Sequence, residues 1–168
     1  IFLRDPSPYH GEKNKRPFFE GWYHKMVTGD GQSLAIIPGI YRSGFNNNQT
    51  AFIMIYDGDK GNVFYEQFEV QQFSCSTSSY SLHIGSNYFS SEKIILDIES
   101  ETLTIKGQVT ANNLKPWPVT LFEPGCMGWY AYVPTMECFH GILSMDHTLD
   151  GKIELNGSNY DFVGGRGY

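Results

Sequence analysis

The sequence predicts an all-β domain built as an antiparallel β-barrel. Apolar residues alternate with a period of two along most of the chain, and no window of ten residues carries the i, i+3, i+4, i+7 stripe of an amphipathic helix. Gly, Pro and β-branched residues interrupt every candidate helix. Closing a sheet of about ten short strands into a barrel removes its exposed edges, which favours a barrel over a sandwich.

The first strand is expected over residues 18–27, FFEGWYHKMV. Since side chains alternate across a strand, one face would carry Phe18, Glu20, Trp22, His24 and Met26, while Tyr23 would lie on the other. The same spacing predicts further strands at residues 33–37, 50–56, 63–73, 80–84, 93–99, 102–110, 119–122, 128–133, 138–148 and 152–156.

Residues that tolerate a positive φ separate several of these strands. They occur in Gly29-Asp30-Gly31, Asp57-Gly58-Asp59 and Asp150-Gly151. Asp150-Gly151 is the clearest of the predicted hairpin turns, because an Asp-Gly pair suits the two central positions of a tight turn.

Length and composition place the chain among soluble globular domains. A chain of 168 residues is long enough for one domain, and only 18% of its residues are charged, which argues against intrinsic disorder. No run approaches the roughly 18 apolar residues that a membrane-spanning helix needs. The net charge of −6 argues against a nucleic-acid partner, since the one cluster of Lys and Arg, at residues 13–16, is short.

The cysteines and the chain ends bear on localisation. Cys75, Cys126 and Cys138 match no metal or redox spacing, so we expect free thiols in a reducing compartment. The chain starts at Ile1 and stops directly after a Gly-rich turn, so residues 1–168 are interpreted as one barrel domain within a longer chain. With no targeting segment visible, a location in the cytoplasm or at the periphery of a membrane is expected.

The stretch GCMGWYAYVPTMECFHGILSMDH, residues 125–147, combines aromatic and titratable residues. If residues 138–148 form a strand, His140 and Asp146 share one face with Ser144, while His147 lies on the other. In a barrel, His140 and Asp146 would then either line the interior together or face solvent together. The sequence leaves both alternatives open.

Glu20 could likewise lie inside or outside the barrel. Large apolar and aromatic residues flank it on its own face of the strand. If that face is interior, burial would raise the pKa of Glu20 and suit it to donate a proton near neutral pH. The alternative is a buried glutamate whose charge is satisfied by a neighbouring hydrogen bond or ion pair.

Other chemistries receive less support. Glu137, His140, Asp146 and His147 are of metal-ligand types, but they alternate across the predicted strand and would not converge, so no metal site is predicted. No nucleophile elbow or phosphate loop is present. The 12 Phe, 11 Tyr and 3 Trp must largely form the core, although an aromatic-lined barrel would also suit an apolar ligand or stabilise a carbocation.

The chain resembles the tocopherol cyclase family. The resemblance is carried by PYHGEKNKRPFFEGWYHKM (8–26), LAIIPGIYR (34–42), EPGCMGWYAYVPTMECFHGILSMDHTLDGKIELNG (123–157) and YDFVGGRGY (160–168). It is strongest at both ends and weak from about residue 43 to 118. The combination of FFEGWY, PGCMGWYAYVP and MDHTL before GGRGY is far more specific than any one of these patterns.

The resemblance implies a lipocalin-like or calycin-like barrel that forms the first half of a two-barrel protein. The family closes a chromanol ring on a prenylated benzoquinol, with no redox change and no organic cofactor. That reaction needs a proton for the alkene of the prenyl tail, a tertiary cation shielded from water, and capture of the cation by the phenol oxygen.

Candidate site residues follow from this chemistry and from the motifs. Glu20 or Asp146 would donate the proton, and His140 or His147 would be its partner or the phenol base. The expected substrate-binding residues are Trp22, Tyr23, His24, Trp129, Tyr130 and Tyr132. The expected partners are an apolar small molecule, the remainder of the same chain and a membrane surface.

Two other hypotheses remain open at this point. The domain could be a lipocalin-like binding module for an apolar quinol or another lipid, with no catalysis. It could instead be a structural domain whose barrel is filled by its own side chains. A cavity lined by acidic and imidazole groups would favour the enzyme, and a packed interior would favour the structural domain.

Overall fold

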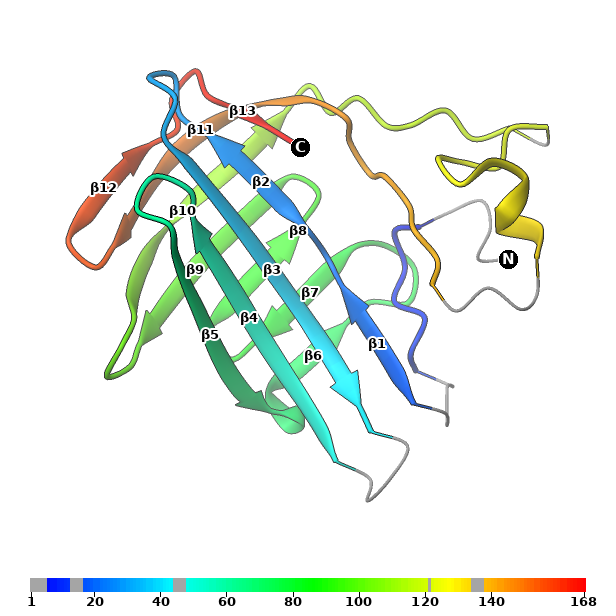
Figure 1. The fold of residues 1–168 in the computed structure, drawn as a ribbon, viewed down its shortest axis with the longest axis horizontal. Helices are drawn as coiled ribbons and strands as arrows, with labels where there is room; N and C mark the ends of the chain where they lie inside the picture. Colours follow the sequence, from blue (N-terminus) through cyan, green and yellow to red (C-terminus); the bar gives the residue numbers. More distant parts are fainter. Residues whose placement is uncertain (1–5, 13–16, 44–47, 121, 134–137) are drawn as a thin grey trace.

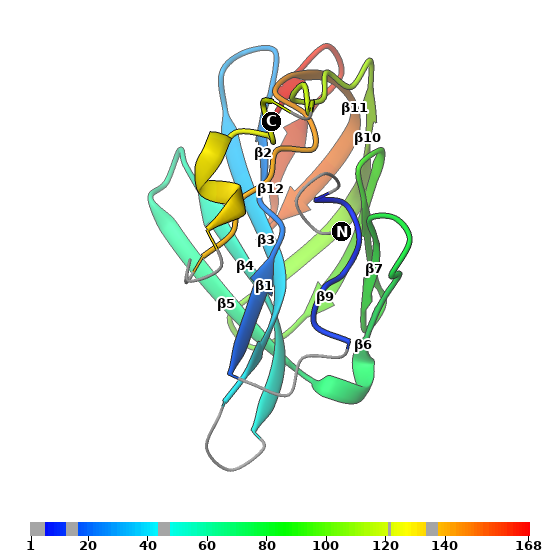
Figure 2. The same ribbon diagram turned by 90° about the vertical axis from the view of Figure 1, so that its right-hand side faces the viewer.

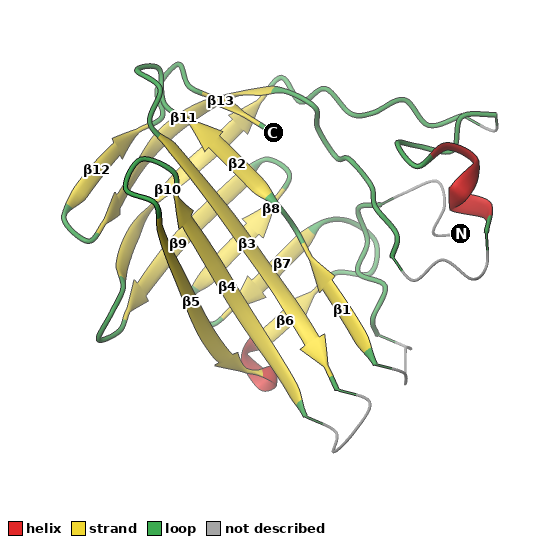
Figure 3. Cartoon of the chain, in the orientation of Figure 1, coloured by secondary structure: helices red, strands yellow, loops and turns green. Residues whose placement is uncertain are grey.

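A computed structural model describes residues 6–12, 17–43, 48–120, 122–133 and 138–168 of the chain. The described chain is antiparallel β-sheet with two short 3-10 helices and no α-helix, which confirms the all-β prediction (Figures 1 and 3). The basic cluster at residues 13–16 and the candidate ligand Glu137 lie outside the described residues.

The elements run in the following order along the chain: β1 (Phe18–Gly21), β2 (His24–Val27), β3 (Ser33–Arg42), β4 (Gln49–Asp57), β5 (Asn62–Glu69), η2 (Val70–Gln72), β6 (Phe73–Cys75), β7 (Ser81–Ile84), β8 (Asn87–Ser90), β9 (Lys93–Glu99), β10 (Thr104–Asn112), η3 (Gly128–Tyr132), β11 (His147–Leu155), β12 (Ser158–Asp161) and β13 (Arg166–Gly167).

All thirteen strands of the described chain belong to one sheet, in the order β5-β4-β3-β2-β13-β11-β10-β9-β8-β7-β6, with β1 also paired to β3 and β12 to β11. The sheet curls into a lipocalin-like half-barrel, in which β3, β4 and β5 face β7, β8 and β9 across the core (Figures 1 and 2). The path ends at β5 and β6, which the helix η2 connects.

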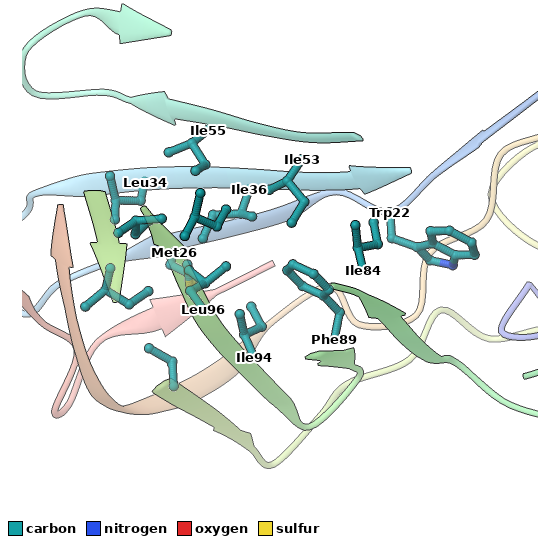
Figure 4. Close-up of a cluster of buried hydrophobic side chains, with 14 of the residues drawn as sticks. Trp22, Met26, Leu34, Ile36, Ile53, Ile55, Ile84, Phe89, Ile94 and Leu96 are labelled. Atoms are coloured by element: carbon teal, nitrogen blue, oxygen red, sulfur yellow. The ribbon is translucent and has the colours of Figure 1, made fainter. Parts of the chain in front are cut away.

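The interior between these two walls is filled by aliphatic and aromatic side chains (Figure 4). Strand alternation places Ile36 of β3, Ile53 and Ile55 of β4 and Phe89 of β8 in this core, all fully buried. Each such side chain stabilises the fold by about 1.5–3 kcal/mol through removal of apolar surface from water. The half-barrel is therefore a packed core over most of its length.

The predicted strand over residues 18–27 is divided into β1 and β2. Gly21 pairs with Gly39 and His24 pairs with Ile36, which leaves Trp22 opposite Pro38. Trp22 donates its backbone N–H to the carbonyl of Pro38 at 3.0 Å, but proline has no N–H to return, so the ladder is interrupted there. The predicted alternation of faces nevertheless continues through the break.

The predicted hairpin at Asp150-Gly151 is wrong. Both residues lie inside β11, where Asp150 pairs with Thr110 and Gly151 with Val109. Gly151 has a φ of 130°, and a Cβ there would lie 2.2 Å from the carbonyl oxygen of Gln108. This glycine is needed for a close approach of β11 to β10, and the hairpin turn follows at Asn156-Gly157, where both φ angles are positive.

The strands predicted at residues 128–133 and 138–148 are also wrong for most of their length. Residues 128–132 form the 3-10 helix η3, and β11 begins only at His147. Between β10 and β11 the chain leaves the sheet, and we call residues 113–146 the excursion (Figure 1). Positive φ angles at Gly125 and Gly128 break the extended backbone that the alternating pattern suggested. None of the described residues of the predicted strand at 119–122 is in a strand; residue 121 lies outside the described part.

Candidate functional site

The inner face of β1 and β2 carries the residues that the strand period assigned to it. Trp22 and Met26 are buried, and Glu20 and His24 are partly buried, whereas Tyr23 on the opposite face is exposed. Tyr23 instead contacts the ring of Tyr168, at a centroid distance of 6.3 Å. The structure therefore places Tyr23 outside the barrel, away from the other candidates of this stretch.

Glu20 lies at the end of the half-barrel where β1 and β6 approach each other, which we call the mouth. Residues 6–12 cross the mouth between these two strands (Figure 2). On one side Tyr9 donates its backbone N–H to the carbonyl of Ser76, directly after β6, and on the other side His10 bonds Glu20 of β1. The N-terminal segment thus links the two walls of the sheet.

The carboxylate of Glu20 is held by His10 through both of its oxygens. The backbone N–H of His10 donates to Oε2 at 3.0 Å, and Nδ1 of His10 lies 2.7 Å from Oε1. The Glu20 side chain is only 15% exposed. A proton lies between Nδ1 and Oε1 in a partly dehydrated site, so Glu20 is both interior and satisfied by a partner, as the second sequence alternative required.

An aromatic cluster forms around Tyr9, the residue before His10. The Tyr9 ring lies 5.4 Å from Phe73, 6.2 Å from Phe18 and 6.4 Å from Trp22, as centroid distances. Burial raises the pKa of the Tyr9 hydroxyl, and its oxygen accepts a hydrogen bond of 2.8 Å from Nη2 of Arg42.

A second group of side chains continues from the mouth into the core. The rings of Trp22 and Tyr80 stack at 5.3 Å, and Tyr80 stacks on His24 at 5.6 Å. Nε2 of His24 lies 2.6 Å from the Tyr80 hydroxyl oxygen. Burial, with a smaller contribution from His147, lowers the pKa of His24 to about 4, and burial raises the pKa of Tyr80 well above its usual range. Both groups are neutral at pH 7, so Tyr80 donates its hydroxyl hydrogen to Nε2.

His147, at the start of β11, is buried next to His24. The two histidines line a cavity of about 10 Å³, which is about the size of one water molecule. Nδ1 of His147 lies 3.1 Å from Oγ of Ser144. Burial lowers the pKa of His147, although the charge of Asp146 opposes the shift. His147 is interior, but the cavity that it lines is far too small for a substrate.

Asp146 and His140 do not lie in the interior. Asp146 bonds Lys115 at 2.8 Å and Nε of Arg166 at 2.9 Å, and these hydrogen bonds lower its pKa to about 2. A carboxylate of this pKa is ionised at neutral pH and holds no proton to donate. His140 is exposed in the excursion. The solvent-facing alternative is therefore correct for both residues, and the strand face on which they were grouped does not exist.

The aromatic residues of the excursion do not line the barrel either. Trp129 is 66% exposed and Tyr130 is 68% exposed, and Trp129 contacts Tyr132 at a centroid distance of 5.6 Å. The excursion instead encloses a separate apolar pocket of about 40 Å³ against Pro6. Its lining includes Trp117, Val119, Met127, Phe139 and Ile142.

The cysteines offer no nucleophile at the mouth. Cys75, Cys126 and Cys138 are free thiols, as predicted. Burial and the nearby charge of Glu20 raise the pKa of Cys75 to about 12, so this thiol is protonated and unreactive at neutral pH. In the part of the chain that the structure describes, no three His, Cys, Asp or Glu residues converge as metal ligands would.

Sequence reasoning missed the partners at the mouth. His10, Tyr9 and Arg42 all fall in stretches that carry the family resemblance, but no periodic pattern connects them with Glu20. Tyr80 lies in a polar segment that gave no signal beyond the predicted strand. A paired acid and imidazole separated by ten residues becomes visible only when the N-terminal segment folds back along β1.

Comparisons with known proteins identify no relative of this chain. No family model matches the chain, and neither a curated protein nor a solved structure matches it significantly. Among the described residues, none of the helices has the length and apolar character needed to cross a membrane.

Proposed function

We propose that this chain carries the acid–base pair of a tocopherol cyclase-like reaction, in which a chromanol ring closes on a prenylated benzoquinol. The observation that supports the proposal most directly is the partly buried Glu20 carboxylate on the inner face, 2.7 Å from His10 Nδ1. Both residues belong to the first stretch that resembles the family, with His10 in PYHG and Glu20 in FFEGWY.

The reaction suits a pair that gives one proton and takes one back. A proton from the Glu20–His10 pair adds to the alkene carbon and leaves a tertiary cation on the neighbouring carbon. The phenol oxygen bonds to that cation, and its proton returns to the pair. No electron is gained or lost overall, and the pair regains its starting state without a cofactor.

The surroundings of the pair suit the cationic intermediate. The rings of Tyr9 and Phe18 already stabilise one cation, the Arg42 guanidinium, whose central carbon lies 6.0 Å from each ring centroid. Partial exclusion of water around Glu20 protects the cation from hydration. The filled core is the outcome that favours the structural domain, and it leaves no room for a prenyl tail deeper in the half-barrel, so the proposed reaction is confined to the mouth.

The test is an incubation of the full-length protein with a prenylated benzoquinol under argon in D₂O. Ring closure adds one non-exchangeable deuteron to the former alkene carbon, so the chromanol appears one mass unit heavier and at a new retention time. The wild type is expected to form this product, and Glu20→Gln is expected to reduce the rate at least 100-fold. No product from the wild type would refute the proposed reaction.

Asp146→Asn tests which of the two candidate proton donors, Glu20 or Asp146, acts in the reaction. Because Asp146 is ionised and bonded to Lys115 and Arg166, this variant is expected to retain chromanol formation. Loss of product in Asp146→Asn, with normal turnover in Glu20→Gln, would reverse the assignment.

A second candidate function is a lipocalin-like binding module for an apolar quinol or another lipid. The pocket between Pro6 and the excursion favours it, because its lining is apolar apart from His140 and Cys126 and contains no Asp, Glu, Lys or Arg. Its volume of about 40 Å³ admits only a small part of such a ligand. Saturable quenching of tryptophan fluorescence by a prenylquinol, without chromanol formation, would favour binding over catalysis. Trp117→Ala should then weaken the binding, because Trp117 lines the pocket.

A further inference from the structure

Tyr9 is the aromatic residue of the segment 6–12, and its ring is inserted into the mouth of the half-barrel. It is only 8% exposed, although the segment that carries it is not part of the sheet. A phenol ring is therefore buried at the one end of the barrel where Glu20 faces inward.

The socket around this phenol is formed by residues of the sheet and its connections. Phe73 of β6 and Phe18 of β1 contact the ring edge-on, and Trp22 contacts it at a tilt of 47°. Arg42, at the end of β3, donates to the phenol oxygen at 2.8 Å. These groups recognise both properties of a phenol, an aromatic ring and an oxygen that accepts a hydrogen bond.

The socket would remain if the Tyr9 side chain swung out. Phe18, Arg42 and Phe73 belong to β1, β3 and β6, and Trp22 follows β1, whereas the Tyr9 side chain is held by ring contacts, by the Arg42 guanidinium over its ring and by the hydrogen bond from Arg42. The backbone around Tyr9 has separate anchors, at Ser76 through the Tyr9 N–H and at Glu20 through His10. The ring can therefore leave while the Glu20–His10 pair stays in place.

We infer that the socket filled by Tyr9 is a binding site for the phenol ring of a ligand, and that the Tyr9 side chain is the gate that the ligand displaces. The ligand class is a para-substituted phenol or a hydroquinone. Placing the ring of a prenylquinol there rests on the proposed function. Tyr9 directly precedes His10, whose backbone N–H bonds Glu20, so a phenol in the socket would lie beside the acid–base pair.

Gly11 provides an independent way to block the socket. A Cβ at residue 11 would lie 2.5 Å from the Tyr9 hydroxyl oxygen and 2.4 Å from Cε1 of Phe18. Both distances are too short for non-bonded atoms, so Gly11→Ala removes the space that the oxygen of a bound phenol needs and displaces Phe18 as well.

The first test uses 4-methylphenol, which has the structure of the tyrosine side chain. The full-length Tyr9→Ala protein is expected to bind 4-methylphenol at least tenfold more tightly than the wild type, measured by fluorescence of the adjacent Trp22 and by the rise in Tm. Toluene, which lacks the hydroxyl, should bind at least fivefold more weakly than 4-methylphenol. Adding Arg42→Met should remove that preference.

Matched controls test whether the gain in 4-methylphenol binding comes from the socket. Tyr41→Ala removes an exposed tyrosine from the same sheet and should gain no binding. Gly11→Ala added to Tyr9→Ala should abolish the binding, because its Cβ would overlap the bound phenol oxygen. Tyr9→Ser serves as the second opening variant if Tyr9→Ala does not fold. The inference is wrong if neither Tyr9 variant binds 4-methylphenol more tightly than the wild type, or if Arg42→Met leaves the preference over toluene unchanged.

The second test concerns the gate in the unmodified protein. Adding a prenylated benzoquinol to the full-length wild type should increase the hydroxyl-radical labelling of Tyr9 at least threefold, because the ring moves into water. Unchanged or reduced labelling at a saturating concentration would overturn the inference.

These measurements separate the inference from the proposed reaction. Binding of 4-methylphenol to Tyr9→Ala without chromanol formation by the wild type would support the socket and refute the reaction. Chromanol formation with no gain of binding in either variant would support the reaction and refute the socket.

Discussion

His10 and Glu20 are joined by two hydrogen bonds, one from the backbone N–H of His10 to Oε2 and one between Nδ1 and Oε1. The first is 3.0 Å long and the second 2.7 Å. Since Glu20 belongs to β1 and His10 to the segment that crosses the mouth, this pair fixes the N-terminal segment on the half-barrel.

Glu20→Gln should therefore lower the free energy of unfolding by about 1–2 kcal/mol, because a hydrogen bond to a charged group is replaced by a neutral one. Urea denaturation at pH 7 measures this loss. Glu154→Gln, at an exposed position of β11, is the matched control and should be within about 0.5 kcal/mol of the wild type. Equal effects of the two substitutions would show that the His10–Glu20 bonds do not hold the segment.

Stability should fall in acid because His24 is neutral in the folded state. Its pKa is about 4 in the fold and 6.5 ordinarily, so between these values the unfolded chain binds more protons than the folded one. The stability that a neutral, buried His24 provides is fully present above pH 6.5 and is lost as the pH falls toward 4. Between pH 7 and pH 5 the loss is about 2 kcal/mol, and His147, whose pKa is also lowered by burial, adds to it.

His24→Gln tests this assignment, since glutamine can still bond the Tyr80 hydroxyl but does not titrate. Urea midpoints measured at several pH values should fall less steeply in the variant than in the wild type. If the urea midpoints of the two proteins fall in parallel with pH, the lowered pKa of His24 is wrong.

Gly167→Ala should be strongly destabilising for a steric reason. A Cβ at residue 167 would lie 2.1 Å from Nε2 and 2.6 Å from Cδ2 of His147, whose ring is buried and has little room to move. We expect a loss of about 1–3 kcal/mol, typical of overpacking. Thermal unfolding measures it.

Two comparisons check the cause of that loss. Gly29→Ala is the control, because the nearest atom to its Cβ would be the Val163 carbonyl oxygen at 3.8 Å. Combining Gly167→Ala with His147→Ser should cost less than the sum of the single losses, since removing the ring relieves the clash. If the losses of the two single variants simply add in the double variant, the destabilisation by Gly167→Ala does not come from a clash with His147.

Trp22 and Trp129 should differ sharply in their effect on stability. Trp22 is buried against Tyr9 and Tyr80, so Trp22→Ala should lower the free energy of unfolding by about 3–5 kcal/mol. Trp129 is mostly exposed, so Trp129→Ala should change it by less than about 0.5 kcal/mol. A large loss in Trp129→Ala, measured by urea denaturation, would place the excursion in the core.

The period-two alternation of apolar residues predicted most of the strands and the face on which Glu20 lies, but not the partners of Glu20. Alternation placed Glu20, Trp22 and His24 on one face without deciding whether that face is interior, and the structure shows that it points inward even across the interruption opposite Pro38. It failed where apolar residues alternate without forming a strand, as in residues 128–133, because Gly125 and Gly128 take positive φ angles. It also missed β8, β12 and β13.

By itself, the sequence determined the all-β class and the side of β1 and β2 on which each side chain lies, because strand geometry alternates side chains locally. Only the tertiary structure decided that His10 bonds Glu20, that Tyr9 fills the mouth, and that Asp146 bonds Lys115 and Arg166 at the surface. These contacts join segments ten or more residues apart in sequence. They depend on how the sheet curls and where the excursion leaves it, which no local period encodes.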